Sequence, residues 1–238
     1  MFLSKRFFSY LLIFPGVLLL FSCTNTDRKT EEGTASSPLF FHYEVSGDEE
    51  LGFMTIKLQY LKDGEQGNPV SLDEQQVKFD GAFLTEQRTK RGGPYYEVSL
   101  PLDSFSGRHV VEFMYADDQP LRDEFEFSLF SLAAPIPDTV YRGNLEIPLK
   151  GLKDGARVHI LLTDTSFYSK GIDRVDTVES GRVTLSGNDL KEVSNGPVQL
   201  ELYQEEEQPV NKGKIHGGLL NFSYGIKRSF ELRDSLKK

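Results

Sequence analysis

The amino-acid sequence predicts an all-β protein. Short runs rich in β-branched and aromatic residues alternate with Gly, Asp, Asn and Pro about every ten residues, which is typical of antiparallel sandwiches and barrels. Within several runs, apolar residues occupy every second position, as in the set Met54, Ile56, Leu58 and Tyr60. Because successive side chains of a strand point to opposite faces, each such set predicts one face buried in a core.

Thirteen runs fit strands. The first six are Leu39–Ser46, Met54–Leu61, Val77–Phe79, Tyr95–Leu100, His109–Tyr115 and Glu124–Leu129, the last with Phe125, Phe127 and Leu129 on one face. The other seven are Leu145–Leu149, Arg157–Leu162, Arg174–Val178, Arg182–Leu185, Val198–Tyr203, Gly217–Tyr224 and Ile226–Leu232. We expect a bend or bulge at Tyr224-Gly225, which separates the last two runs.

A proline-rich segment divides the runs into two groups. Pro135 and Pro137 disfavour both a helix and a central strand, so they predict a boundary between a domain at 38–132 and another at 133–238. Six or seven short strands in each half resemble tandem immunoglobulin-like or fibronectin-type antiparallel β-sandwiches. The resemblance rests on strand number and spacing, because the chain lacks the tryptophan and the cysteine pair of antibody domains. One continuous β domain is the alternative.

The N-terminus has the pattern of a secretory signal peptide. Lys5 and Arg6 precede the uncharged apolar run Phe7–Phe21, which is shorter than the roughly 20 residues of a spanning helix. An uncleaved membrane anchor is the alternative.

The four residues Leu20-Phe21-Ser22-Cys23 follow this pattern and resemble the bacterial lipobox, although Phe21 is larger than the residue usual at its position. The resemblance implies a signal peptide at 1–22, cleavage before Cys23, and lipid, including palmitate, on that cysteine. Cys23 is the chain's single cysteine and so has no intrachain disulfide partner, which agrees with lipidation. The polar segment 23–37 is expected to be a flexible tether. Thr24 after the cysteine favours the outer membrane in this family, and both a periplasmic and a cell-surface orientation stay open.

The charge distribution disfavours nucleic acid as a partner. The chain carries a net charge of −9, and the negative charge falls mainly on the first predicted domain. Nucleic-acid binding needs a basic surface, which the sequence does not offer.

Residue patterns for catalysis or metal binding are absent from the sequence. No G-x-S-x-G motif occurs, and His42, His109, His159 and His216 are isolated residues of predicted strands or turns. The acidic clusters at 48–50 and 117–118 lack the spacing of a calcium loop, and Glu205-Glu206-Glu207 is expected at a hairpin tip. We therefore expect no enzyme activity, no cofactor and no metal site.

Three tyrosines are the candidates for ligand stacking: Tyr168 in a predicted loop, and Tyr95 and Tyr96 after Gly92-Gly93-Pro94. Adjacent tyrosines in a strand face opposite sides, so Tyr168 is the stronger candidate. The leading hypothesis is a membrane-anchored envelope lipoprotein that binds or assembles with a protein partner or an extracellular polymer. The alternative is a carbohydrate-binding or carbohydrate-active lipoprotein of a nutrient-uptake system.

Overall fold

The computed structural model of the chain describes residues 39–72, 77–115, 119–166, 169–210 and 217–235. They belong to one compact unit, Ser36–Lys238. The predicted signal peptide, Cys23 and the predicted tether lie outside the described residues. Within the described residues, the structure contains no helix that is both long and apolar enough to cross a membrane.

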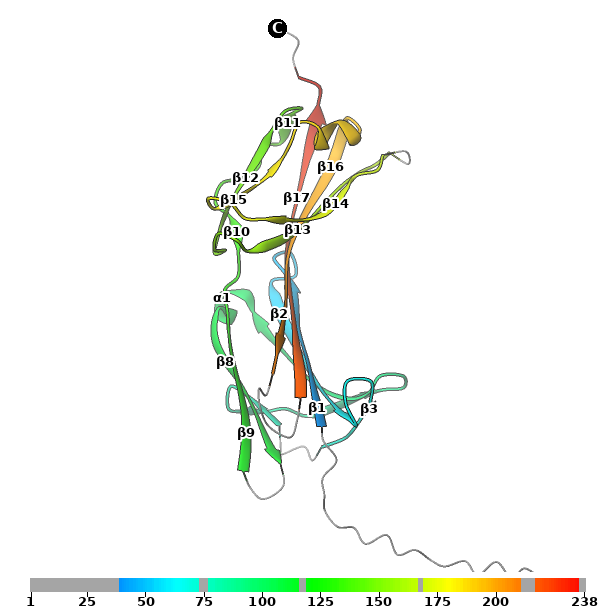
Figure 1. Cartoon of the computed structure of the whole chain (residues 1–238), viewed down its shortest axis with the longest axis vertical. Helices are drawn as coiled ribbons and strands as arrows, with labels where there is room; N and C mark the ends of the chain where they lie inside the picture. The colour runs from blue at the N-terminus through cyan, green and yellow to red at the C-terminus, as the bar shows by residue number, and fades with distance from the viewer. Residues whose placement is uncertain (1–38, 73–76, 116–118, 167–168, 211–216, 236–238) are drawn as a thin grey trace, which may run out of the picture. The chain divides into compact units, whose positions relative to one another are not determined.

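Nearly all regular structure consists of strands (Figure 1). The elements of the first half are β1 (Leu39–Asp48), β2 (Phe53–Lys62), β3 (Asn68–Pro69), β4 (Val77–Phe79), β5 (Ala82–Phe83), β6 (Glu86–Thr89), β7 (Gly93–Pro101), α1 (Leu102–Phe105), β8 (Gly107–Tyr115) and β9 (Gln119–Phe127). Those of the second half are β10 (Ser131–Leu132), β11 (Thr139–Tyr141), β12 (Leu145–Lys150), β13 (Arg157–Asp164), β14 (Ile172–Thr177), β15 (Arg182–Leu185), the 3₁₀ helix η2 (Asp189–Glu192), β16 (Gly196–Pro209) and β17 (Gly217–Arg233).

The strands form one long sheet and two small ones. The long sheet has the order β14-β13-β16-β17-β1-β2-β7-β6, with β11 beside β17 and β3 beside β2. A four-stranded sheet of order β5-β4-β8-β9 belongs to the first half, and a three-stranded sheet of order β10-β12-β15 belongs to the second. The predicted all-β class with sandwich packing in tandem is therefore confirmed.

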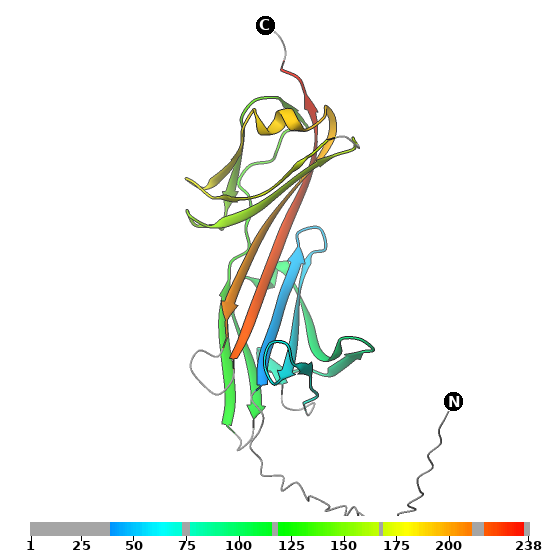
Figure 2. The same ribbon diagram turned by 45° about the vertical axis from the view of Figure 1, so that its right-hand side comes forward.

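The two sandwiches share the hairpin of β16 and β17. These strands pair without interruption from Gly196↔Leu232 to Pro209↔Leu219, and the hairpin runs through both halves (Figures 1 and 2). The Gly217–Gly225 part of β17 also pairs in parallel with β1, so the last strand of the chain lies beside the first. All other strand pairs of the described residues are antiparallel except β11 with β17. The domain boundary near residue 133 stays a prediction. The chain passes from one sandwich to the other near residue 133 and again along β16 and β17.

The two runs predicted on either side of Tyr224-Gly225 form one strand, because β17 continues through these residues without interruption. A glycine is nevertheless required there: a Cβ atom on Gly225 would lie 2.5 Å from the ring of Tyr203, which covers it from β16. The glycine lets the two strands keep their pairing under the ring.

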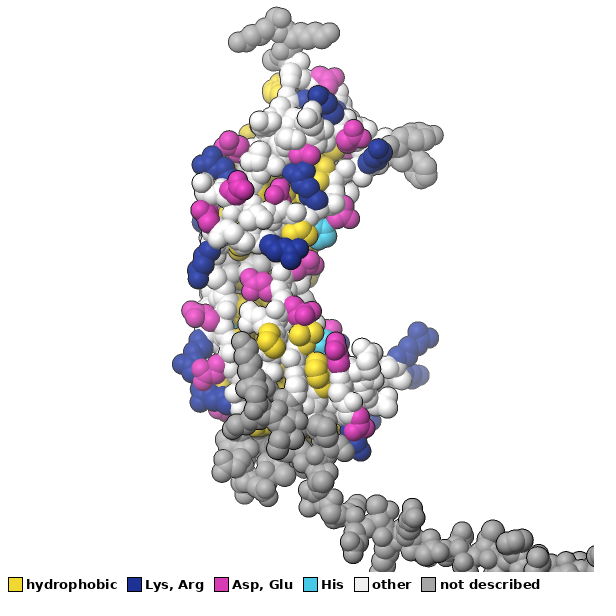
Figure 3. Space-filling view, viewed as in Figure 1, with side chains coloured by type: hydrophobic (Ala, Val, Ile, Leu, Met, Phe, Trp, Pro, Cys, Tyr) yellow, Lys and Arg dark blue, Asp and Glu magenta, His cyan; other side chains and the backbone are white. Residues whose placement is uncertain are grey.

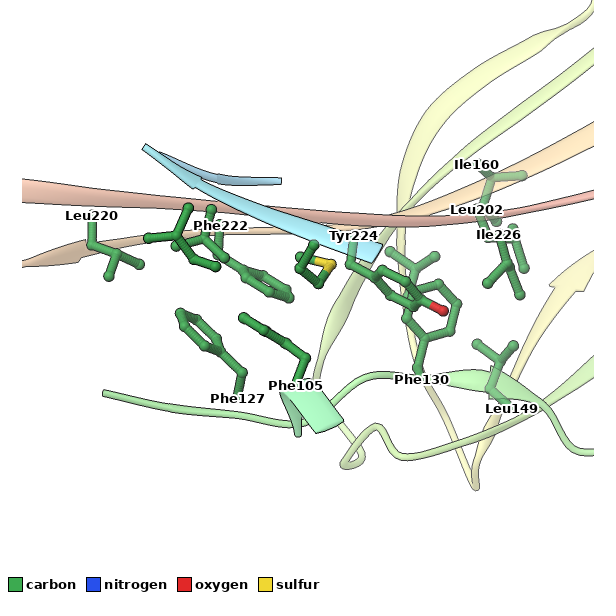
Figure 4. Close-up of a cluster of buried hydrophobic side chains, with 14 of the residues drawn as sticks. Phe105, Phe127, Phe130, Leu149, Ile160, Leu202, Leu220, Phe222, Tyr224 and Ile226 are labelled. Carbon is green, nitrogen blue, oxygen red and sulfur yellow. The ribbon is translucent and has the colours of Figure 1, made fainter. Parts of the chain in front are cut away.

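Aromatic side chains fill the first sandwich and continue to its junction with the second (Figure 4). The ring of Phe222 on β17 stacks on Phe127 of β9 with centroids 4.5 Å apart, and Phe130 meets Tyr224 edge-on at 5.5 Å. In Figure 4, Leu149 lies on the opposite side of the core from Leu202 and Ile226 of the long sheet. The core is therefore continuous along β17.

The predicted alternation is seen in the burial of side chains. Met54, Ile56, Leu58 and Tyr60 of β2 are all buried, as are Phe125 and Phe127 of β9. Leu129 lies beyond the end of β9 and is only partly buried, whereas the next residue, Phe130, is in the core.

Candidate functional site

The most distinctive surface feature of the described residues is the second part of β16. Strand β13 pairs with β16 only between Val198 and Tyr203. Strand β16 then continues for six residues, Gln204–Pro209, paired with β17 on one side. Within the described ranges, no strand pairs with its other side, so these residues form an open strand edge, hereafter the β16 edge.

Three consecutive glutamates lie in the middle of the β16 edge. The sequence prediction of a hairpin tip at Glu205-Glu206-Glu207 is wrong, because these residues are part of a continuous strand. The side chains alternate: Glu205 and Glu207 lie on the outer face of the sheet, and Glu206 lies on the face that carries Phe222. All three are exposed. Acidic groups therefore lie on both faces of this edge.

A polar row lines the inner side of the β16 edge. Gln204 Nε2 donates a hydrogen bond to Glu206 Oε1 at 2.7 Å, and Gln208 Nε2 donates to Glu206 Oε2 at 3.3 Å. Gln204 is buried, and its Oε1 has no hydrogen-bond partner among the described atoms. A buried acceptor without a donor carries a free-energy cost, so this part of β16 holds an unsatisfied polar group.

A hollow of about 500 Å³ lies over the outer face of the edge. It is lined by residues of β1, β13, β16 and β17: Glu44, Val45, Ser46, Arg157, Glu205, Glu206, Glu207, Asn221, Phe222 and Ser223. Three outer-face glutamates, Glu44, Glu205 and Glu207, against one arginine make this lining acidic. His159 adjoins it, with Nδ1 3.7 Å from Glu205 Oε2.

A second, smaller hollow of about 290 Å³ lies on the inner side, between the end of β16 and β9. Strand β9 is at the edge of the four-stranded sheet, so two edges that are open among the described strands meet at this hollow. Its lining combines Asp123, Glu124 and Gln208 with the apolar residues Phe125, Pro209, Val210 and Leu220.

Asp123 connects this second hollow to the core. Tyr43 donates its hydroxyl hydrogen to Asp123 Oδ2 at 3.0 Å. Burial, together with the neighbouring Tyr60 and Asp123, raises the pKa of Tyr43 well above its usual range, so the hydroxyl stays a donor at neutral pH. This bond keeps a carboxylate at the mouth of the hollow.

The tyrosines predicted as ligand platforms have different environments. Tyr168 lies outside the described residues. Tyr96 is 1% exposed and donates its hydroxyl hydrogen to the carbonyl of Leu72 at 2.9 Å, so it has no free ring face. Tyr95 is partly exposed on the opposite face, where its hydroxyl donates to Gln87 Oε1 at 2.9 Å and Lys57 Nζ lies 5.7 Å from the ring centroid.

A buried histidine is the feature that the sequence did not indicate. His109 is 5% exposed, with Nδ1 2.7 Å from Asp80 Oδ2 and Nε2 2.6 Å from the carbonyl oxygen of Phe105. Its ring stacks on Phe105 and Phe79. Asp80 Oδ1 also accepts the backbone N–H of Val110 at 2.8 Å. The contacts are all internal, so they indicate a structural role for the pair. Its members are 29 positions apart in the sequence, which left no local pattern to detect.

Metal-ligating side chains do not gather in the ranges that the structure describes: no group of three or more His, Asp or Glu is placed to hold an ion. In the acidic cluster at 48–50, Asp48 Oδ1 accepts the backbone N–H of Leu51 at 2.7 Å, and Glu49 pairs with Arg228 at 2.5 Å. Charges of both signs are spread over the face shown in Figure 3.

Comparisons with known proteins identify no family. No protein-family model matches the chain, and no curated protein matches it. Among solved structures, the chain is similar to a 1.5-MDa bacterial ice-binding adhesin at 13% identity, with 84% of this chain and 66% of that chain covered and a TM-score of 0.23. It is also similar to a tetra-tandem repeat in the extending region of a large adhesion protein at 15% identity, with 80% of this chain and 49% of that chain covered and a TM-score of 0.24. A third similarity is to Dpr11 IG1 bound to DIP-gamma IG+IG2, at 7% identity, with 83% of this chain and 96% of that chain covered and a TM-score of 0.23. These TM-scores are too low to support an inference about this chain.

Proposed function

We propose that this protein is an envelope lipoprotein, anchored to the outer membrane through lipid on Cys23, that binds a protein partner without catalysing a reaction. The observation that carries the binding proposal is the acidic, partly unpaired end of β16, with a hollow on each of its two faces. An exposed surface of this charge attracts a partner that presents basic residues.

The proposed anchor follows from the sequence pattern of residues 1–37. Several acyl chains hold a protein stably at a membrane, at about 0.8 kcal/mol for each buried methylene, whereas a single chain holds it only reversibly. We expect Cys23→Ala to move the protein from the membrane fraction to the soluble fraction after a high-salt wash. Continued sedimentation with membranes would contradict lipid anchoring.

The binding proposal is tested by photo-cross-linking in intact cells, with a photoreactive residue at position 207 and a matched one at exposed Glu65, in the turn after β2. We expect one discrete protein adduct from position 207 and none from position 65. Adding Glu205→Lys should remove the adduct, because it reverses a charge in the same acidic lining. Identical adduct patterns from both positions would contradict a partner site at the β16 edge.

The carbohydrate alternative rests on Tyr95 within the described ranges, since Tyr96 is buried. It predicts saturable binding to a glycan array that weakens in Tyr95→Ala. A silent array together with a protein adduct at position 207 favours a protein partner.

A further inference from the structure

The β16 edge occupies a position in the long sheet where a neighbouring strand would fit. Strand β13 lies on this side of β16 for six residue pairs, from Asp164↔Val198 to His159↔Tyr203, and the chain enters β13 only at Arg157. The same side of β16 then continues through Gln204–Pro209 without a partner among the described strands. An added strand there would extend the line of β13.

We propose that the β16 edge binds an extended segment of the partner protein as an additional strand, and that basic residues alternate with apolar ones in this segment. The inference rests on the proposed function, because it specifies how the partner occupies the same site. Pairing at an exposed sheet edge is an established mode of peptide recognition, in which main-chain hydrogen bonds give affinity and alternate side chains give specificity.

Charge argues for the composition of the segment. Outward side chains of an added strand would face Glu205 and Glu207, and opposite charges on adjacent strands stabilise their pairing. Inward side chains would pass Glu206 and Gln208 and reach the smaller hollow, where Phe125, Val210 and Leu220 line the wall beside Asp123 and Glu124. Lys or Arg therefore suits the outer positions, and apolar residues suit the inner ones.

The same charges exclude other strands. Charged residues on an edge commonly protect it from pairing with unrelated chains. Glu206 at the inner side and Glu205 and Glu207 at the outer side would repel an acidic strand or a second copy of this edge. An acidic edge thus prevents self-association and still admits a basic strand, which is selection by repulsion as well as attraction.

Synthetic peptides test the proposal on the full-length protein in detergent micelles. The probe is an eight-residue peptide of alternating Lys and Val, and two derivatives carry N-methyl groups on either all the lysines or all the valines. In a strand, successive N–H groups point to opposite edges, so only one derivative loses the donors that face β16. We expect that derivative to bind about tenfold more weakly than the parent peptide, since it loses several main-chain hydrogen bonds. The other derivative should keep the parent's affinity.

Two further measurements localise the bound strand. Amide exchange within Gln204–Gln208 should slow when the parent peptide binds. Glu207→Lys should weaken binding, whereas the matched variant Glu65→Lys should leave it unchanged, and a peptide of alternating Glu and Val should not bind.

The outcomes separate this inference from the proposed function. Equal binding by both methylated derivatives, or no binding of the Lys-Val peptide while position 207 still cross-links to a partner, would overturn strand addition and leave the proposed site standing. If position 207 gives no protein adduct in the otherwise unchanged chain, the site itself is refuted.

Discussion

The shared hairpin predicts that a residue near the C-terminus stabilises the N-terminal sandwich. Phe222 of β17 is 2% exposed and stacks on Phe127 of β9 at 4.5 Å. Truncation of a buried phenylalanine to alanine costs about 3–5 kcal/mol through lost burial and the cavity that remains. Since domains are stable by only about 5–15 kcal/mol, Phe222→Ala should remove a large part of the free energy of unfolding.

Chemical denaturation followed by circular dichroism measures this loss, with Ser229→Ala as the control because Ser229 is exposed in the same strand. Amide exchange then shows where the loss occurs. We expect amides of β8 and β9, about 100 residues away in sequence, to lose protection in Phe222→Ala. A change no larger than the about 0.5 kcal/mol of a surface substitution, or lost protection confined to residues 133–210, would refute the shared-hairpin reasoning.

Three further predictions follow from single contacts. Gly225→Ala should destabilise the protein by about 1–3 kcal/mol, because its Cβ would meet the ring of Tyr203, and a double-mutant cycle with Tyr203→Ala should show a smaller than additive loss. Burial, followed by the hydrogen bond to Glu201, raises the pKa of Tyr203 to about 12, so its absorbance titration should have a midpoint near that pH. Because this folded-state pKa is raised, the associated stability is full below the ordinary tyrosine pKa of about 10 and is lost as pH rises to 12, and Glu201→Gln should lower the midpoint. Asp80→Gly tolerates the left-handed backbone of Asp80 (φ 48°) and removes its hydrogen bonds, including that to buried His109. Thermal unfolding should show that the free energy of unfolding falls by about 1–3 kcal/mol. An unchanged melting temperature would contradict a structural role for the pair.

The local sequence was sufficient to predict most of the longer strands, but it did not predict the short strands β3, β5, β6, β10 and β11. Alternation in Met54–Tyr60 and in Phe125–Phe127 gave the buried faces correctly, because side-chain direction in a strand is set by the backbone alone. The signal peptide and the proposed lipid on Cys23 also depend only on contiguous residues, and they stay predictions.

The arrangement of the strands was decided by contacts between distant segments. Pairing of Phe40 with Gly217 joins residues 177 positions apart, and no local pattern specifies which strands become neighbours. The candidate site depends on the same fact. Glu205-Glu206-Glu207 has the composition of a turn, but pairing with β17 holds it in a strand. Because the pairing with β13 ends at Tyr203, its other side has no partner among the described strands. Sequence therefore determined most of the longer strands and the faces that they bury. Only the tertiary structure decided which edge is left without a partner among the described strands, because an open edge depends on where a neighbouring strand ends.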